Sequence, residues 1–397
     1  MTQYLIIGNG VAGTTAAESL RKQDPTGSIT MITEENLPFY YRIRLPDFLA
    51  GIINEEQLLA QKTAWYDEQR ITLITASRVI SADPEAKNVT TDSAGIIPYD
   101  RLLIATGSHS FVPPISGSDK KGVFTLRDIS DARAIKAYAA QVRRVVIIGG
   151  GLLGLETGQA LRKLDKEVTI VEFFSHLLPR QLDAEGGARL KQIMETGMGF
   201  SFKLASSTKE IAGKESANGV VLEGGETLPC EMVIISAGVR ASLDLALNLE
   251  LSYDKGIKVN ERLETSRPDI FAAGDVAEFG GRPPYGIWPA AMQQGKIAGI
   301  TMAGGSAVYS GTTMANKLKV VGIDLAAAGD IDADNHYQTQ ITATATTYRK
   351  IVIDQNRIIG CILLGDTSDF TKLTKAITDR SELHLFDQNP NPSAAAQ

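Results

Sequence analysis

The chain has 397 residues, of which 43% are hydrophobic, so it is long enough for two or three domains and can bury several cores. Its formal net charge of −6 and the lack of any long basic run argue against nucleic acid as a partner. No stretch approaches about 18 consecutive apolar residues, and a strand is predicted almost from Met1 onward, so we expect neither a membrane span nor a signal peptide and predict a cytoplasmic protein.

Cysteine and histidine are few and scattered. Cys230 and Cys361 are the only cysteines, 131 positions apart, so no disulfide framework is expected. The four histidines lack metal-ligand spacing, and they are His109, His176, His336 and His384. We expect no structural metal, and we expect both thiols to be small residues of the core.

The chain opens with a pattern typical of nucleotide binding. A predicted strand at 4–7 is followed by three glycines in GxGxxG spacing, which are Gly8, Gly10 and Gly13. A helix at 14–23 and a strand at 29–33 then lead to Glu34, which stands 21 positions after the last glycine. The first glycine permits a tight turn, the second lets backbone approach a pyrophosphate, and the third lets the helix lie close to the strand. The helix N-terminus favours phosphate, and the acid can accept hydrogen bonds from a ribose diol.

Less regular segments follow. Residues 36–51 predict a loop leading into a short helix. This segment is either a packed connection with solvated arginines or a wall over the first nucleotide. Residues 71–80 are apolar and favour β structure, and 86–97 predict a hairpin. Residues 99–108 predict a buried strand that ends in a glycine turn, 111–114 a linker, and 125–140 a helix.

The opening pattern then occurs a second time. A strand at 145–148 precedes glycines in the same spacing, which are Gly149, Gly151 and Gly154. A helix at 155–164 and a strand at 167–171 lead to Glu172, 18 positions after the last glycine. Residues 231–240 predict a closing strand with a small-residue turn, like 99–108 in the first copy. Two such patterns, 141 residues apart, predict two bound dinucleotides and electrons that move between them.

The last third has two parts. In 266–278 a short strand delivers Gly274 and Asp275 to a turn, where the aspartate either binds hydroxyl groups or only caps the turn. A helix is predicted at 288–300, with Pro289 in its first turn. Beyond 304 we expect an antiparallel sheet with strands at 312–321, 326–330, 340–348, 350–354 and 358–364, then a helix at 369–379 and a disordered tail from Gln388.

The predicted fold class is α/β, with two Rossmann-like dinucleotide-binding domains and a small α+β C-terminal domain. We expect the first domain to comprise 1–115 and 240–305, the second 116–239, and the third 306–397.

With these motifs in order, the chain resembles the FAD-dependent pyridine nucleotide-disulfide oxidoreductase superfamily, whose type is glutathione reductase. The resemblance covers residues 1 to about 305 and rests on GNGVAG, YDRLLIATGS, GGGLLGLE and RPDIFAAGDVAE. YYRIRLPDFLAG and the compact last domain are more similar to NADH:rubredoxin oxidoreductases and to the flavoprotein portion of assimilatory nitrite reductases.

The resemblance implies two sets of cofactor-binding residues. The FAD set is Gly8, Gly10, Gly13, Glu34, Arg42, Thr106, Gly107, Arg127, Gly274, Asp275 and Trp288. The NADH set is Gly149, Gly151, Gly154, Glu172 and Gly238. The helix at 288–300 would direct its N-terminus toward the flavin, where a dipole effect of about 1 kcal/mol corresponds to about 20 mV for two electrons.

Glu156 matches a carboxylate that related enzymes place beside flavin and nicotinamide, often paired with lysine. Here the nearest matches to the lysine are Arg42 or Arg44, and arginine stays charged, which argues against a proton-donor role. The alternative for Glu156 is an acid in the first turn of a helix, favoured by the dipole.

The flavin-adjacent cysteines of disulfide reductases are missing between Glu34 and Gly51, so electrons are expected to leave the flavin directly. The leading interpretation is an NADH-dependent reductase of rubredoxin or a similar small iron–sulfur carrier. Two alternatives stay open: an NADH oxidase that uses oxygen, and a redox-sensing interaction protein. A basic docking patch would have to come from Arg42, Arg44, Lys317, Lys319, Arg349 and Lys350, each of which could equally be a solvated surface charge.

Glu172 predicts a preference for NADH, because the 2′-phosphate of NADPH would lie beside a carboxylate. His176 and Arg180 follow closely in sequence and would weaken that repulsion.

Overall fold

The computed structural model describes residues 1–312 and 315–382, with the backbone alone for 315–320. The chain forms two compact units, which we describe separately. The first comprises Met1–Arg44, Ile53–Ser110 and Val239–Thr312, and the second comprises Leu45–Ile52, Phe111–Gly238 and the described residues from 315 onward. The finer division into three domains remains our proposal.

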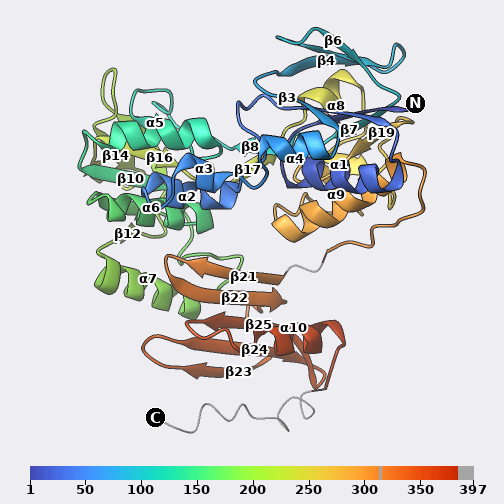
Figure 1. The fold of residues 1–397 in the computed structure, drawn as a ribbon. Coiled ribbons are helices and arrows are strands. Elements are labelled where there is room, and N and C mark those ends of the chain that lie inside the picture. The colour runs from blue at the N-terminus through green and yellow to red at the C-terminus, as the bar shows by residue number, and fades with distance from the viewer. Residues whose placement is uncertain (313–314, 383–397) are drawn as a thin grey trace. The chain divides into compact units, whose positions relative to one another are not determined.

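The first unit is built around a five-stranded parallel sheet (Figure 1). In spatial order its strands are β19 (Ile270–Ala272), β7 (Arg101–Ile104), β1 (Gln3–Ile7), β2 (Ser28–Ile32) and β3 (Ile71–Ile74). Successive residues of β1 face opposite sides, so Ile6 joins one core cluster while Leu5 and Ile7 join the other. Burial on both faces explains why these strands are almost continuously apolar.

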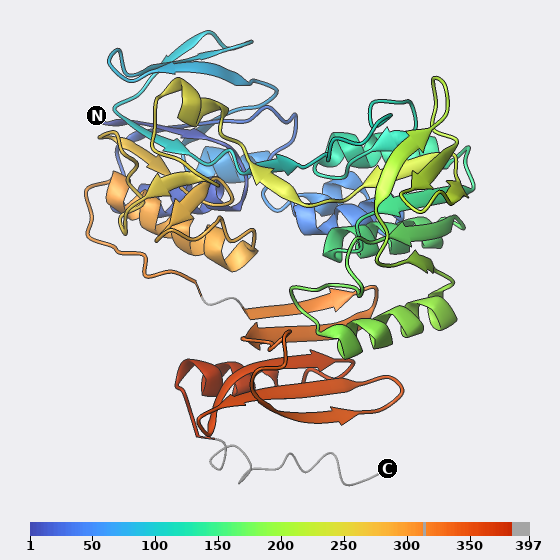
Figure 2. The ribbon, with the colours of Figure 1, turned by 180° about the vertical axis from the view of Figure 1, so that it is seen from behind.

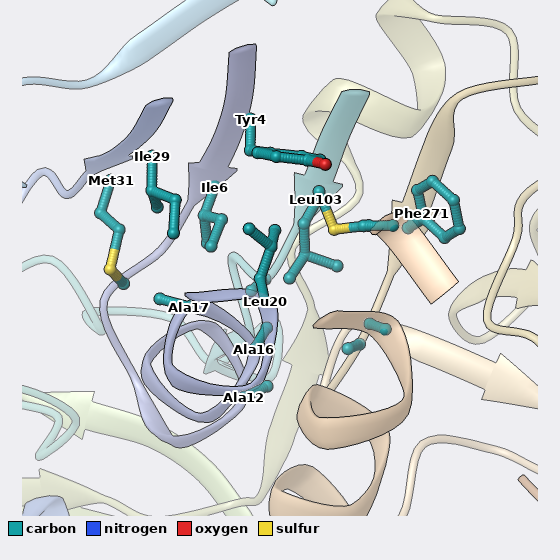
Figure 3. Packing of buried hydrophobic residues seen from close by; sticks show 14 of the residues in the cluster. Tyr4, Ile6, Ala12, Ala16, Ala17, Leu20, Ile29, Met31, Leu103 and Phe271 are labelled. Carbon is teal, nitrogen blue, oxygen red and sulfur yellow. The ribbon is translucent and has the colours of Figure 1, made fainter. Parts of the chain in front are cut away.

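Two helices, α1 (Val11–Gln23) and α9 (Trp288–Met302), pack against each other on one side of this sheet (Figure 1). Their contact is lined by small residues. A Cβ on Gly295 would lie 2.3 Å from the Ala12 carbonyl oxygen, and one on Gly299 would lie 2.3 Å from that of Ala16. Figure 3 shows Leu20 of α1 directed toward the strand side chains, while Ala12 and Ala16 lie on the side of α1 that faces the neighbouring helix. The absence of side chains at the two glycines therefore sets how closely the helices approach.

The other elements of the first unit are short. They are a 3-10 turn (Arg42–Arg44), the helices α3 (Glu55–Leu58), α4 (Thr63–Glu68) and α8 (Asp244–Asn248), and the strands β4 (Val79–Asp83), β5 (Asn88–Thr91), β6 (Ile96–Pro98), β8 (Ser108–Ser110), β17 (Val239–Ala241), β18 (Ile257–Val259) and β20 (Ala277–Phe279). Strands β4, β5 and β6 form an antiparallel insert, β8 pairs with β17, and β18 pairs with β20.

The second unit repeats the same plan. Its parallel sheet has the order β12 (Ser201–Lys203), β11 (Glu167–Val171), β10 (Arg144–Ile148), β16 (Met232–Ile235) and β9 (Val123–Phe124). It is accompanied by the antiparallel insert β13 (Thr208–Ala212), β14 (Gly219–Leu222) and β15 (Thr227–Pro229), and by the helices α2 (Leu45–Leu49), α5 (Ile129–Ala139), α6 (Leu152–Lys163) and α7 (Ala184–Met198).

The C-terminal part of the second unit is a five-stranded antiparallel sheet, seen from both sides in Figures 1 and 2. The strands are ordered β21 (Ala315–Val320), β22 (Ile323–Gly329), β25 (Arg357–Leu364), β24 (Tyr348–Asp354) and β23 (Gln338–Ala343). Helix α10 (Phe370–Thr378) covers one face, where Phe370 and Leu373 pack with Ile351 and Leu363.

The predicted fold class is confirmed. Several boundaries were wrong. Helices α1 and α6 begin three residues earlier than predicted, because Gly10 and Gly151 are the N-caps and the third glycine of each motif lies inside the first turn. The predicted β structure at 71–80 is confirmed, and it belongs to two strands, β3 and β4, with Ala76 between them at a φ of +50°. Helix α5 begins only at Ile129, because the Asp128 side chain caps it.

Helix α7 was not predicted. It begins with a capping aspartate and carries buried Leu190 and Met194, so a period-3.6 pattern was present in the sequence. The predicted tail from Gln388 lies outside the described residues.

Candidate functional site

The first glycine motif forms a tight loop between β1 and α1. Gly8 has a φ of +112°, and a Cβ there would lie 2.1 Å from the Ala105 carbonyl oxygen. A Cβ on Gly13 would lie 2.0 Å from the Gly8 carbonyl oxygen. Gly10 differs, because its backbone is extended and no protein atom lies within 4 Å of the position of its Cβ. The fold therefore requires glycine at two positions, while the third leaves open space at the start of α1.

The second motif repeats this geometry between β10 and α6. Gly149 has a φ of +113°, and its Cβ would lie 2.2 Å from the Ser236 carbonyl oxygen. The Cβ of Gly154 would lie 2.2 Å from the Gly149 carbonyl oxygen, whereas Gly151 again faces open space. A helix N-terminus with room for close approach suits a phosphate group, so both loops fit a dinucleotide pyrophosphate.

The acids that follow the second strand of each copy are placed differently. Glu172 is buried, with one carboxylate oxygen accepting from the Gly150 N–H at 2.6 Å and the other from the Phe174 N–H at 2.9 Å. The Glu34 side chain is 70% exposed and lies 3.8 Å from Arg78. Only Glu172 is fixed against its own glycine loop.

The middle residue of each glycine motif accounts for part of this difference. A Cβ on Gly150 would lie 3.1 Å from the Glu172 carboxylate, so a side chain there would crowd the acid. The first copy has Asn9 at this position, and its amide oxygen accepts from the Tyr66 hydroxyl at 2.9 Å and from the Thr14 hydroxyl at 3.3 Å.

The closing strands place small residues at the carboxyl edge of each sheet. Thr106 donates to the Ser242 carbonyl oxygen at 3.4 Å, and Gly107 follows with a φ of +69°. Gly238 has a φ of +96° and no protein atom within 4 Å of its Cβ position.

The turn after β19 is tied to α9. The Gly274 N–H donates to the side-chain oxygen of Gln294 at 2.7 Å, and Gln294 is only 1% exposed. Asp275 accepts from the Ser108 hydroxyl at 3.1 Å. At the start of α9, Trp288 stacks on Tyr41, with ring centroids 5.6 Å apart, so the segment 36–44 meets α9 within the first unit.

Arg42 and Arg44 lie in the first unit and are held by different partners. Arg42 forms an ion pair with Glu35 and donates to the Tyr40 hydroxyl at 3.0 Å, while Tyr40 itself donates to Glu35. Arg44 donates to the Gln57 carbonyl oxygen at 3.2 Å. Arg42 is thus fixed by a side-chain network and Arg44 by backbone.

Glu156 lies in α6 of the second unit. Burial, followed by the charge of Asp47, raises the pKa of Glu156 to about 7, so near neutral pH it can gain or lose a proton. It is the fifth residue of α6, and the interpretation as a first-turn acid was wrong. Because Glu156 and Arg42 belong to different units, their pairing remains a proposal.

Arg127 also belongs to the second unit, just before α5, where its N–H donates to Asp131 at 2.8 Å. Its predicted contact with FAD remains a proposal.

Both cysteines are core residues, as predicted. Cys230 and Cys361 are buried, and burial raises the pKa of Cys230 to about 12 and that of Cys361 to about 11. Neither thiol forms a reactive thiolate near neutral pH.

Within residues 1–312 and 315–382, no group of three or more metal-binding side chains is arranged to hold an ion. No helix of this described part is both long and apolar enough to cross a membrane.

Lys350 was wrongly predicted as a surface charge. It is 1% exposed and pairs with Asp183 at 3.1 Å, because the alternation of β24 turns it toward α7. Arg349, its neighbour, lies 3.7 Å from Asp369. The side chains of Lys317 and Lys319 lie outside the described part of the structure.

The sequence analysis did not identify four residues that contact or influence the predicted site residues. Glu35 holds Arg42, Asp47 acts on Glu156, Asn9 fixes the first loop and Gln294 holds Gly274. The doubled acid after β2 was a visible signal for Glu35, whereas the roles of Asp47 and Gln294 depend on long-range packing.

Two family models match the chain. The model for pyridine nucleotide-disulphide oxidoreductases matches residues 2–295, and that for the rubredoxin NAD+ reductase C-terminal domain matches residues 315–381.

Individual relatives agree with these matches. The chain is 34% identical over 385 residues to a nitrite reductase [NAD(P)H] of Bacillus subtilis, covering 96% of this chain and 48% of the relative. It is 34% identical to the NADH-rubredoxin oxidoreductase of Clostridium acetobutylicum, covering 95% and 94% of the two chains. A crystal structure of an NADH:rubredoxin oxidoreductase from that organism superposes with a TM-score of 0.84 at 33% identity, covering 98% and 100%. An NADH oxidase of Methanocaldococcus jannaschii is 33% identical, covering 77% of this chain and 71% of the relative.

The chain spans about half the length of the first curated relatives it matches, from 46% to 50%. The matches nevertheless cover both nucleotide-binding motifs and the C-terminal sheet. The chain therefore belongs to the pyridine nucleotide-disulphide oxidoreductase family.

Proposed function

We propose that the chain is an NADH-dependent flavoprotein reductase that passes electrons to a small iron–sulfur carrier such as rubredoxin. The observation that carries this proposal is the pair of equivalent loops, in which Gly10 and Gly151 leave space that the fold itself does not need. Bound FAD would accept hydride from NADH and release electrons one at a time. The protein supplies binding, alignment and charge.

The first unit would hold FAD. Gly8, Gly10 and Gly13 would shape the pyrophosphate site and Glu34 would take the ribose. Thr106, Gly107, Gly274 and Asp275 would line the rest of the cofactor. The resemblance also assigns Arg127 to FAD. The start of α9, at Trp288, would favour negative charge on the reduced ring. This dipole can tune the potential by about 20 mV and cannot set it.

The second unit would hold NADH on Gly149, Gly151, Gly154 and Gly238, with Glu172 on the adenosine ribose. The two N–H donors to Glu172 hold the carboxylate in one orientation. A 2′-phosphate about 4 Å away would be repelled by up to about 4 kcal/mol at an effective dielectric near 20. We therefore expect kcat/KM to be at least about tenfold higher for NADH than for NADPH. Equal values would contradict the role of Glu172.

Two charged side chains would act where nicotinamide and flavin meet. Glu156 would hold or release a proton near neutral pH, because burial raises its pKa to about 7. Arg42 stays charged and is kept in place by Glu35, so it would stabilise negative charge and not donate a proton.

The absence of a reactive thiol supports an external acceptor. Cys230 and Cys361 are buried and protonated, so neither would relay electrons. The match of the C-terminal sheet to rubredoxin NAD+ reductases favours a rubredoxin-like carrier. Steering by a basic patch is weakened, because Arg42 is paired with Glu35, Arg349 lies near Asp369 and Lys350 is buried. We expect only a modest fall in carrier reduction with added salt.

The test is an anaerobic titration of the purified holoenzyme with NADH, followed by rapid mixing with oxidised rubredoxin. Bleaching of the flavin absorbance by one equivalent of NADH, then fast reduction of rubredoxin, supports the proposal. Rapid reoxidation by oxygen with slow rubredoxin reduction would favour the oxidase alternative, which the relative of Methanocaldococcus jannaschii also favours. Slow turnover with every acceptor would favour a redox-sensing protein.

A further inference from the structure

The buried ion pair between Lys350 and Asp183 joins the C-terminal sheet to helix α7. The Lys350 ammonium lies 3.1 Å from one Asp183 oxygen and donates to the Asp332 carbonyl oxygen at 3.0 Å. Tyr348, on the same face of β24, donates its hydroxyl to that Asp183 oxygen at 2.7 Å. The side chains of Lys350 and Asp183 are 1% and 11% exposed, so each charge depends on the other for compensation.

Asp183 is also the N-cap of α7. Its second oxygen accepts from the Gly186 N–H at 3.0 Å, which satisfies one of the free donors at the start of the helix. One turn further along, Arg189 donates to the Thr344 carbonyl oxygen and stands over the Tyr348 ring, 5.9 Å from its centroid. In both views α7 lies beside the C-terminal sheet (Figures 1 and 2). The sheet thus holds the first turns of α7 by several polar contacts.

The start of α7 packs in turn on the loop that precedes it. A Cβ on Gly187 would lie 2.9 Å from the His176 Cβ and 2.9 Å from the Leu177 carbonyl oxygen. The Leu177 side chain approaches the second glycine motif, since a Cβ on Gly150 would lie 2.9 Å from it. His176 also lies 3.3 Å from the Leu182 carbonyl oxygen.

Residues 173–182 therefore form a loop that is anchored at both ends. One anchor is Glu172, bonded to the Gly150 N–H, and the other is Asp183, bonded to Tyr348 and Lys350. The loop carries Phe173 and Phe174 next to the ribose acid, and both are exposed. Contacts to the C-terminal sheet and contacts to the second glycine motif therefore both hold this loop in position.

We propose that Lys350 and Tyr348 are positioning residues for the NADH site. By holding Asp183, they fix the loop 173–182 against Gly150, and so determine how tightly the adenosine half of the nucleotide binds. This inference rests on the proposed NADH site and adds residues from a domain with no nucleotide-binding motif of its own.

The test measures binding of ADP-ribose, which has the adenosine half of NADH without the nicotinamide, to the FAD-loaded full chain by calorimetry. We expect Lys350→Met to raise the Kd about tenfold and Tyr348→Phe to raise it about threefold. In steady state KM for NADH should rise while kcat at saturation stays unchanged, and FAD content should equal that of the wild type. Lys375→Met is the matched control, since Lys375 is exposed on α10 of the same sheet domain and its loss should leave the Kd unchanged.

Lys350→Met alone leaves the Asp183 charge buried and unpaired, which could unfold the protein. The double variant Asp183→Asn/Lys350→Met avoids this, because it leaves no unpaired buried charge. Its asparagine oxygen can still cap α7, and we expect a folded protein with a raised Kd. Variants that melt at lower temperature but bind ADP-ribose as tightly as the wild type would overturn the positioning role. A wild-type protein that binds FAD but no ADP-ribose would instead overturn the proposed NADH site.

Discussion

At the scale of single residues, two environments decide the chemistry of the site. Glu172 is held by two backbone N–H groups at the edge of its glycine loop. Glu156 is buried and feels the charge of a second carboxylate, Asp47. The first environment favours a fixed charge that recognises a ribose, and the second favours a proton that moves near neutral pH.

The pKa of Glu156 predicts a pH-dependent effect on stability. In the folded protein burial raises this pKa from 4.5 to about 7, so the folded state binds the proton more tightly than the unfolded state. The wild type should therefore lose stability relative to Glu156→Gln as pH rises from about 4.5 to about 7, and the difference should stay constant above that. The total is up to about 3 kcal/mol in the free energy of unfolding.

Urea unfolding of both proteins between about pH 4.5 and pH 8 measures this difference. Asp47→Asn is the informative control, because removing the neighbouring charge lowers the pKa of Glu156. The difference in the free energy of unfolding caused by Glu156→Gln should therefore be smaller in the Asp47→Asn background. If the free energies of unfolding of wild type and Glu156→Gln changed in parallel with pH, the pKa of Glu156 would not be raised in the folded protein.

At the scale of elements, the contact between α1 and α9 holds the first site together. α1 begins at the first glycine loop and α9 begins at Trp288, so their packing fixes two helix N-termini relative to each other. Gln294 of α9 also holds the Gly274 turn, which connects this helix pair to the edge of the sheet.

Replacement of Gly299 should separate these helices. In Gly299→Ala the new Cβ would lie 2.3 Å from the Ala16 carbonyl oxygen and 3.0 Å from the Leu20 nitrogen, and backbone cannot move aside cheaply. We expect a loss of about 1–3 kcal/mol in the free energy of unfolding, measured by urea titration, together with weaker FAD binding.

Gly197→Ala provides the comparison for this helix substitution. Gly197 lies in α7, and apart from the backbone of its own helix no atom lies within 4 Å of its Cβ position, so alanine should stabilise the protein by about 0.5–1 kcal/mol. A Gly299→Ala protein that gained stability in the same way would show that α1 and α9 do not need the close approach.

At the scale of the whole molecule, the two glycine loops lie in separate compact units. Each unit has its own parallel sheet, helix N-terminus and acid, and the β1–β2 and β10–β11 pairs have equivalent parallel registers. Binding of each nucleotide should therefore depend mainly on its own unit.

This independence predicts opposite effects for two matched variants. Gly10→Ala should fold normally and lower FAD affinity about tenfold or more, while ADP-ribose binding stays within about twofold of the wild type. Gly151→Ala should do the reverse. FAD fluorescence titration and ADP-ribose calorimetry give the two readouts, with Gly224→Ala, in an open turn between β14 and β15, as control. Loss of both affinities in either variant would contradict the independence.

Much of the fold could be predicted because its signals are local. Gly8, Gly13, Gly149 and Gly154 are required by backbone contacts within their own βα units, so spacing alone located both loops. The thiols Cys230 and Cys361 were correctly assigned to the core, because the first precedes a predicted buried strand and the second lies in a predicted strand of the last sheet. Helix starts were misplaced by three residues because the N-cap in each motif is a glycine and carries no side-chain signal.

The sequence by itself determined that this protein has two glycine loops, an acid after each and no cysteine pair beside the first, since these features depend on residue type and short spacing. Only the tertiary structure decided which charges are exposed and what each one touches. From the sequence, Lys350 could not be told from a surface lysine, but the packing of β24 on α7 buries it against Asp183. In the same way, Arg42 forms an ion pair with Glu35. The partners in these two ion pairs are 167 and 7 positions apart in the sequence. The strength of an ion pair depends on the distance between the charges in space, and short sequence patterns do not contain that distance.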